Sequence, residues 1–551
     1  MKRYMSWLLV MIGVTAVLFG AAREARAANA VVGSGTAASC TEAAFDSALT
    51  TAQVGGGTIT FNCGPAVATI PFSVSKVVNL GNVTIDGGGR IILNANNNDR
   101  HFFAGSGVTF RLRAITLRDG SSLVGGGAIE ASGADVVLEN VELLNNYAEV
   151  NGGAIYCFDG TLTIEDSLLE HNAAATGGAI YNDGCDVGIV GTTFIDNEAL
   201  DTFGRGGAIA NLAPGEVLLH DSLVQGNRAP DGGGLFIDSG ASAIVVNTRL
   251  IDNEGGHGGG LENSGNVTIS HSLIEGNSVT GSGGGLWNMD GSVELLRTTV
   301  RNNTAYEGGG VNSYGSAVEM EEVNIVGNVA TGTHGGGIYH GGGTLFVGNA
   351  TISGNMANDA SANGGGIYQN ADGNLTLTNV TLANNTAGNF GGGLYHYGRY
   401  AILMNVTIAD NAAGVAGDAL YEESPMSAAN PGVIQIANSV IFGSANNCGG
   451  GLFDSLGHNI SRGTCPALSA AGDRENFAGD LRLGPLQFNG GAFAMHTILP
   501  RANSPLINAA DATYCADHDQ RGRARVGVCD MGAVEYEAGG AFRLYLPMAT
   551  R

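Results

Sequence analysis

Acidic and histidine side chains, the groups that most often carry enzyme chemistry, are scattered through this chain. Hydrolysis of a glycosidic bond needs two neighbouring carboxyl groups, and β-elimination needs calcium-binding acids together with a basic residue. The sequence has no Asp-Asp pair and no Arg-x-Lys, and its aspartates recur singly in strand or turn patterns, as at Asp166, Asp196, Asp252 and Asp410. His257 and His334 precede glycine triplets that stand three repeats apart. These spacings favour a non-catalytic protein that holds no metal or other cofactor.

Two alternatives stay open beside that interpretation. A site assembled across neighbouring repeats would make the protein a polysaccharide lyase or a glycoside hydrolase of the pectate-lyase-like type, and a lyase would use calcium. The protein could also be a purely structural component of a surface layer, without a soluble ligand. The interpretation that the sequence favours is adhesion, by binding a polysaccharide or a cell-surface protein.

A row of aromatic residues, found once in most repeats, is the candidate binding surface. Each follows an apolar residue that is expected to point inward, so strand alternation turns the aromatic ring outward. A partly exposed stripe of this kind can stack on sugar rings, or it can stabilise the sheet with no ligand at all. The stripe consists of Tyr156, Tyr181, Phe236, Trp287, Tyr339, Tyr368, Tyr395 and Tyr421.

The elements that would position this stripe are read from a repeat of about 26 residues. A glycine phrase such as "GSGGGLWN" (281–288) recurs twelve times between residues 126 and 420, at intervals of 25 to 29 residues. An asparagine series runs beside it, at Asn146, Asn172, Asn197, Asn227, Asn253, Asn277, Asn303, Asn328, Asn355, Asn385 and Asn411. Gly alone takes positive φ without penalty, and stacked asparagines can hydrogen-bond from one coil to the next. Both series therefore indicate architecture.

Short alternating runs such as "TLTIEDSLL" (161–169) lie between these landmarks and predict strands. One such unit cannot bury its own apolar face, but stacked units can. The sequence therefore predicts an all-β fold, a right-handed single-stranded parallel β-helix of about 13–14 coils of ~26 residues. A phosphate-binding loop is excluded, because it needs Gly-Lys-Ser/Thr and no lysine lies near any glycine phrase.

Almost all variation in repeat length falls between the asparagine and the next glycine phrase. The longest segments there are 198–205, 329–334 and 356–363. Because the coils stack in register, these loops should emerge along one edge of the rod. Repeat proteins often bind ligands where loops vary, although unrestrained surface loops also drift in length.

Composition and the N-terminal segment bear on where the protein works. Residues 1–27 have the layout of a signal peptide, and no later segment is apolar for long enough to span a membrane. We therefore expect a secreted protein, attached to the cell surface or free. The chain has 25 basic and 50 acidic residues, a net charge of −25, which argues against nucleic acid as a partner.

Eight cysteines in an exported chain favour disulfides. Pairing neighbours in sequence gives Cys40–Cys63, Cys157–Cys185, Cys448–Cys465 and Cys515–Cys529, with other pairings formally open. The expected organisation after the signal peptide is an N-terminal cap (28–75) containing an amphipathic helix at 40–52, then the coils (76–447). A C-terminal cap (448–538) and a tail that resembles a sorting signal (539–551) complete the chain.

Two families resemble parts of the chain. The C-terminal region resembles bacterial exported β-helix proteins of the choice-of-anchor Q type, through Asn489-Gly490-Gly491, His496, Pro500, Asn503-Ser504-Pro505, Asp519-Gln520-Arg521-Gly522 and the run Cys529 to Glu535. Asn508 and Val526 depart from that pattern. The coils at 126–420 are similar to the GGA[I/L/V] and FxxN repeats of polymorphic outer-membrane proteins. These resemblances imply a bacterial, adhesin-like β-helix and assign no catalytic role to the motif residues.

Overall fold

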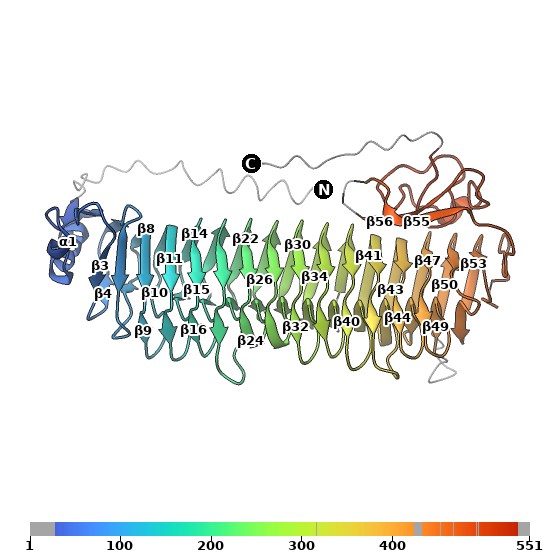
Figure 1. Cartoon of the computed structure of the whole chain (residues 1–551), viewed down its shortest axis with the longest axis horizontal. Helices are drawn as coiled ribbons and strands as arrows, with labels where there is room; N and C mark the ends of the chain where they lie inside the picture. The colour runs from blue at the N-terminus through green and yellow to red at the C-terminus, as the bar shows by residue number, and fades with distance from the viewer. Residues whose placement is uncertain are drawn as a thin grey trace.

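The chain forms a rod of stacked coils with an α-helix at one end and a folded C-terminal region against its side at the other (Figure 1). The structure is a computed structural model that describes residues 28–537, apart from 316, 424–431, 452, 467, 492 and 494. The expected signal peptide (1–27) and the tail (539–551) lie outside the described residues.

A typical coil contributes three strands to a 42-stranded parallel sheet and a short strand of two to four residues to a twelve-stranded one. One coil consists of β13 (Ile155–Phe158), β14 (Thr161–Glu165), β15 (Leu168–Glu170) and β16 (Ala173–Ala174). Every strand pairs in parallel with its counterpart in the next coil, so that Ile155 lies beside Ile180 and Tyr156 beside Tyr181. The short strands form a twelve-stranded sheet from β9 (Ser121–Ser122) to β48 (Ala412–Ala413). The predicted parallel β-helix is confirmed.

The solenoid has about 16 turns, more than the 13–14 expected. Parallel pairing already joins β1 (Ala30–Val32) to β2 (Gly57–Phe61), and it still joins β51 (Val440–Phe442) to β54 (Ile460–Ser461). Neither the glycine phrase nor the asparagine series continues into these end coils. The repeat pattern alone therefore underestimates the length of the rod.

Glycines make each coil turn sharply before its first strand. In the phrase at 281–288, Gly283 has φ +70°, and a Cβ there would lie 2.5 Å from the carbonyl oxygen of Leu286. A Cβ on Gly284 would lie 2.4 Å from the Gly309 oxygen of the next coil. The first glycine is thus required by its positive φ and the second by the close approach of the neighbouring coil.

The asparagine series forms a buried ladder along the rod. Each side-chain Nδ2 donates to Oδ1 of the asparagine in the next coil, at 2.9–3.0 Å, from Asn146 to Asn411. The same Nδ2 also donates to a backbone carbonyl of the preceding coil, as Asn303 does to Ile274. The predicted inter-coil amide bonds are therefore present throughout.

The N-terminal end of the rod is covered by α1 (Glu42–Gly55). Thr41 caps the helix by accepting a hydrogen bond from the Ala44 backbone N–H at 3.2 Å. The buried face consists of Phe45, Ala48, Leu49 and Ala52. An exposed end coil would offer unpaired edges to other chains, and the helix blocks this edge.

The four cysteine pairs expected from the sequence are the disulfides of the structure. Their Cα–Cα distances lie between 4.7 and 6.2 Å, in Cys40–Cys63, Cys157–Cys185, Cys448–Cys465 and Cys515–Cys529. Each joins residues 14 to 28 positions apart, about one coil or less.

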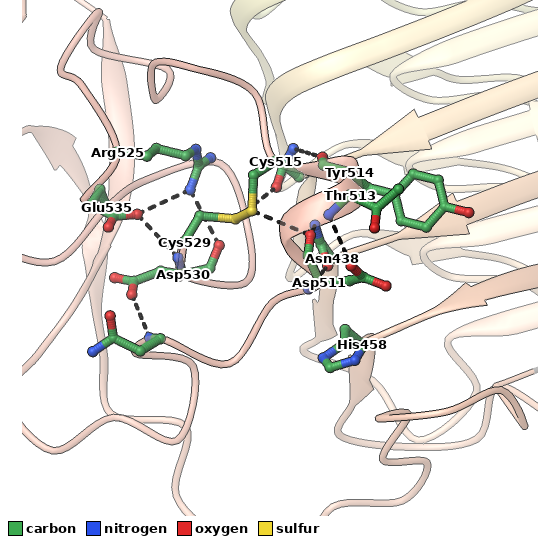
Figure 2. The surroundings of a disulfide bond; sticks show 12 residues. Asn438, His458, Asp511, Thr513, Tyr514, Cys515, Arg525, Cys529, Asp530 and Glu535 are labelled. Atoms are coloured by element: carbon green, nitrogen blue, oxygen red, sulfur yellow. Dashed lines mark hydrogen bonds and ion pairs between the residues drawn. A yellow bond between two sulfur atoms is a disulfide. The ribbon is translucent and has the colours of Figure 1, made fainter. Parts of the chain in front are cut away.

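The C-terminal region folds back onto the last coils, beside β41 (Ile338–Ser353), β43 (Ile367–Ala383) and β47 (Thr407–Ala409) (Figure 1). It contains a small antiparallel sheet of β55 (Leu483–Phe488) and β56 (His496–Pro500). The fully buried Gln520 donates from Nε2 to the Ala350 carbonyl at 2.8 Å, and its Oε1 accepts from the Thr381 hydroxyl at 2.6 Å. Figure 2 shows a second contact, in which Asn438 and Asp511 exchange two hydrogen bonds near the Cys515–Cys529 disulfide.

Candidate functional site

A groove of about 560 Å³ runs along the loop edge of the rod. It crosses four neighbouring short strands, β20 (Glu198–Ala199), β24 (Arg228–Asp231), β28 (Glu254–His257) and β32 (Ser278–Val279). Charged and hydroxyl-bearing side chains line it, among them Glu198, Asp201, Arg228, Glu254, Ser278 and Thr280. The groove therefore lies on the edge where the sequence places its length variation.

The long loop at 198–205 flanks this groove with apolar side chains. Leu200 lines the groove and is 51% exposed, and Phe203 in the same loop is 81% exposed. A phenylalanine that projects so far from the surface buries nothing within its own chain. Exposed rings beside polar grooves are characteristic of ligand-binding surfaces.

The aromatic stripe lies one strand inward from this edge, and half of it is buried. The structure places the eight residues in one register column, but Phe236, Tyr339, Tyr368 and Tyr395 are only 3–8% exposed. Neighbouring tyrosine rings stack with centroids 5.0–5.6 Å apart from Tyr339 to Tyr421. The expectation of a partly exposed stripe holds only for the half-buried Tyr156, Tyr181, Trp287 and Tyr421.

The stripe is covered by residues that come from the preceding coil. The side chain just before a glycine phrase reaches over the aromatic ring that follows the next phrase. His257 and His334 do this, so they cover different rings and do not cooperate. Four covers are direct, with the cationic group or ring centroid 4.3–4.7 Å from the ring that it covers: Arg205 on Phe236, His257 on Trp287, His334 on Tyr368 and Phe390 on Tyr421. The signal in the sequence is a large residue before the glycines, one coil ahead of these four aromatics.

Both covering histidines are fixed as hydrogen-bond acceptors. Nδ1 of His257 accepts from the Ser282 backbone N–H at 3.0 Å, and Nδ1 of His334 accepts from the Asn363 backbone N–H at 3.0 Å. A nitrogen that accepts does not carry the proton, so these hydrogen bonds select the tautomer with the proton on Nε2. Burial lowers the pKa of His334, with the charge of Glu307 acting in the opposite direction.

A glutamate takes the place of an aromatic ring in the middle of the stripe. Glu262 lies between Phe236 and Trp287 in register and is only 3% exposed. Burial raises its pKa to about 8, and the negative charge of Asp231 adds to this, while Arg205 and the Gly232 N–H oppose it. Glu262 is therefore largely protonated at neutral pH.

Polar atoms without partners cluster at this point of the stripe. Oε2 of Glu262, Nε1 of Trp287 and Oδ1 of Asn312 are all buried and have no hydrogen-bond partner among the described residues. The three residues are direct register partners in consecutive coils. The neighbouring carboxyl group of Glu307 does have partners. Its Oε2 accepts from the Tyr314 hydroxyl at 2.7 Å and from Asn312 Nδ2 at 3.1 Å.

A second column, which hydrophobic periodicity does not reveal, lies two residues after each apolar landmark and is polar and buried in most coils. In the earlier coils its polar members are mainly asparagines that bond each other and a turn carbonyl, as Asn263 does with Asn288 and Gly265. Larger groups replace them in the last coils, where the fully buried column reads His340, Gln369, His396 and Glu422. The signal was a polar residue at a strand position that points inward.

Two of these four residues form a pair. His396 Nδ1 is hydrogen-bonded to Glu422 Oε2, and burial raises the pKa of Glu422 against the opposing effect of His396. Burial lowers the pKa of His340 to about 4, with the Gly343 backbone acting in the other direction.

The scattered aspartates do not converge. Asp166, Asp196, Asp252 and Asp410 occupy exposed turn positions with φ between +46° and +53°. Asp and Asn tolerate this left-handed conformation better than most residues, which accounts for their recurrence there. In the described part of the chain, no group of three or more His, Cys, Asp or Glu side chains is arranged to hold a metal ion. Within the same ranges, no helix has both the length and the apolarity that a membrane crossing requires.

Comparison with known proteins supports the architecture. Residues 128–305 match the family model for a right-handed β-helix region, which supports the right-handed winding expected from the sequence. A stretch of 97 residues is 32% identical to metabotropic glutamate receptor-like protein R of Dictyostelium discoideum, covering 17% of this chain and 6% of that protein.

Among solved structures, the chain is similar to the periplasmic alginate epimerase AlgG, with a TM-score of 0.31 and 10% identity over 69% of this chain and 77% of that one. A mutant of the same epimerase gives a TM-score of 0.26 at the same identity and coverage. Similarity at this level carries no functional argument. The conclusion from the comparisons is that residues 128–305 have the sequence of a right-handed β-helix region.

Proposed function

We propose that the protein is a non-catalytic binding protein for a polysaccharide, which it holds along the loop edge of the rod. The observation that carries this proposal is the groove of about 560 Å³ lined by charged and hydroxyl groups, with Leu200 and the 81% exposed Phe203 beside it. Polar side chains that bond hydroxyl groups, next to an aromatic ring that stacks on a sugar face, are what carbohydrate recognition requires.

The charge of the molecule selects among polysaccharides. The chain carries a net charge of −25, and Glu198, Asp201 and Glu254 outnumber Arg228 among the charged side chains of the groove. Such a surface repels polyuronates and sulfated polymers. The favoured ligand is therefore a neutral polysaccharide.

A second groove, of about 470 Å³, lies on the sheet face that contains Ile244 and Phe346. It is formed by the outward side chains of regular strands and has no projecting loop beside it. The loop-edge groove is the better candidate, because its flanking loop at 198–205 is among the longest of the variable segments.

The test compares polysaccharide binding by two single variants. Residues 28–551 are passed through affinity gels containing neutral glucans, mannans or a polyuronate. Phe203→Ser should weaken the binding of a neutral polymer about 5- to 10-fold, because a stacking ring is lost. Phe158→Ser is the matched control, since Phe158 is 40% exposed at the end of β13 and does not line the groove. Equal affinity of the two variants would contradict the proposed groove, and binding to no polymer would favour a purely structural protein.

One observation favours the alternative of a polysaccharide hydrolase. Glu262, with a pKa of about 8, is a carboxyl group that can donate a proton at neutral pH, and the negative charge of Asp231 acts on it. Incubating the protein with the same polymers, with and without calcium, and scoring new chain ends separates the two functions. We expect intact polymers, whereas cleavage that is abolished in Glu262→Gln would establish the hydrolase.

Display outside the cell is part of the same proposal. The choice-of-anchor Q resemblance of the C-terminal region supports an exported protein that is secreted or held at the cell surface. Fractionating cells that express the whole chain tests this. Recovery in the cytoplasm, with an intact N-terminus, would contradict it.

A further inference from the structure

Three consecutive coils carry a buried polar atom that lacks a partner, all in one column of the stripe. They are Oε2 of Glu262, Nε1 of Trp287 and Oδ1 of Asn312. Because the three residues are register partners, their backbones are stacked at the strand spacing of about 4.8 Å. The run stands in the middle of the stripe, between Phe236 and Tyr339.

A run of this kind is energetically unusual. Each buried polar group without a partner costs about 1–3 kcal/mol, and native proteins contain few of them. The asparagine ladder of the same coils shows that this fold can satisfy every amide, since Asn277, Asn303 and Asn328 all have partners. Three neighbouring exceptions therefore point to a group that is absent from the protein alone.

The types of the three atoms define that group. The indole N–H of Trp287 only donates, the Asn312 oxygen only accepts, and a largely protonated Glu262 can donate or accept. A hydroxyl group does both, so one hydroxyl can accept from Trp287 while bonding Glu262, and a second can donate to Asn312. Adjacent hydroxyls on a ring with an apolar face, set against an indole, describe a sugar.

We propose that Glu262, Trp287 and Asn312 form a hydroxyl-binding subsite for one sugar residue of the polysaccharide in the loop-edge groove. This inference rests on the proposed function and identifies the residues that hydrogen-bond the ligand. The subsite takes a neutral hexose unit, because the negative charge of Asp231, which acts on Glu262, disfavours a carboxylated sugar.

His257 is the cover of this subsite. Its ring stacks on Trp287 with centroids 4.3 Å apart, and it stands at the end of β28, whose Gly255 and Gly256 line the groove. Gly258 follows it, so glycines flank the histidine on both sides. Rotation of the His257 side chain, which breaks its hydrogen bond with the Ser282 N–H, would remove the imidazole from Trp287 and connect the subsite to the groove.

The chain supplies its own reporter for the experiment. It has two tryptophans, Trp7 and Trp287, so a protein of residues 28–551 contains Trp287 alone. Titration with cellohexaose and mannohexaose as neutral probes, and hexagalacturonate as the acidic one, should give a saturable change in tryptophan emission with a neutral probe only. Trp287→Phe, which keeps an aromatic ring but loses the N–H, should weaken calorimetric binding of that probe about 3- to 10-fold.

Tyr421→Phe is the matched control, because it also removes one polar group from the stripe at a distant coil. It should bind like the wild type, and thermal melts of both variants show that the fold is retained. If a neutral probe binds and Phe203→Ser weakens it, but Trp287 emission and the Trp287→Phe affinity do not change, the subsite is wrong and the groove stands. If neither neutral probe binds, the subsite and the proposed function both fall.

Discussion

Glu262 places a carboxyl group at a position of the repeat that is aromatic in most coils. Its neighbours in the column, Phe236 and Trp287, are aromatic, whereas at this position a carboxyl group is buried to 3% exposure and feels the negative charge of Asp231. Burial of a carboxylate in a low-dielectric site disfavours its charged form. The protein therefore holds a neutral carboxylic acid where other coils hold a ring.

This burial makes stability depend on pH. The pKa of Glu262 is raised from 4.5 to about 8, so the folded state binds its proton more tightly than the unfolded chain does. The resulting stabilisation is complete below about pH 4.5 and is lost as pH rises to about 8. Glu262→Gln, which has no charge to bury, should therefore become more stable than the wild type as pH rises, by on the order of 2–4 kcal/mol at pH 9.

Thermal melts at pH 5, 7 and 9 measure this difference. Glu254→Gln removes an exposed carboxyl of the same edge and serves as the control. A gap between Glu262→Gln and wild type that stays constant over the three pH values would show that Glu262 does not titrate in this range.

At the scale of elements, the amide ladder and the glycine turns determine the register of the coils. Asn303 shows the connectivity, because its Oδ1 accepts from Asn277 Nδ2 at 2.9 Å and its Nδ2 donates to Asn328 Oδ1 at 3.0 Å. One asparagine thus joins three coils, and its loss leaves buried groups unpaired on both sides.

We expect Asn303→Ala to destabilise the middle of the rod by roughly 2–4 kcal/mol, since several buried hydrogen bonds disappear and their partners remain buried. Hydrogen exchange followed by mass spectrometry should show faster exchange in the coils around 277–328 than at the ends of the rod. Asn374→Ala is the control, as Asn374 is exposed on its strand. Similar exchange in the two variants would mean that the ladder contributes little.

The sequence revealed these elements because each leaves a periodic trace. Positive φ at Gly283 and the bonds of Asn303 recur through the coils between 126 and 420, so the same residue types return about every 26 positions. The burial of Tyr368 left no such trace in its own repeat, because the covering His334 belongs to the coil before. A pattern read along one coil misses contacts made between two.

The same limit applies to the interior column and to the ends. His340, Gln369 and Glu422 are polar residues at a strand position that faces inward. Hydrophobic periodicity cannot identify such residues as buried. The first and last coils were missed because β1 and β54 pair with the rod without carrying its repeat. The helix at one end was predictable because amphipathic spacing is local.

At the scale of the whole molecule, the C-terminal region is attached along the side of the rod. Gln520 is fully buried between the region and the coils, and bonds Ala350, Thr351 and Thr381. These contacts join positions up to 170 residues apart. The region can therefore hold the last coils together without forming a coil itself.

Gln520→Ala should loosen this attachment while leaving the central coils unchanged, because it removes three hydrogen bonds at one interface. Limited proteolysis is expected to release fragments from 483–537 several-fold faster in this variant. His518→Ala is the control, since the His518 side chain is exposed and its backbone carbonyl still binds Asn379. Equal cleavage rates would show that the interface does not depend on Gln520.

The stacking of coils also determines how the molecule responds to tension. The hydrogen bonds that join one coil to the next point along the rod, so a force applied to its two ends loads them in series and opens the coils one at a time. A coil of about 26 residues releases roughly 90 Å of extended chain. Stretching in optical tweezers should therefore give a staircase of such steps, shortened where Cys157–Cys185 closes a loop. The rod would lengthen many times over under load while the coils not yet opened keep their structure.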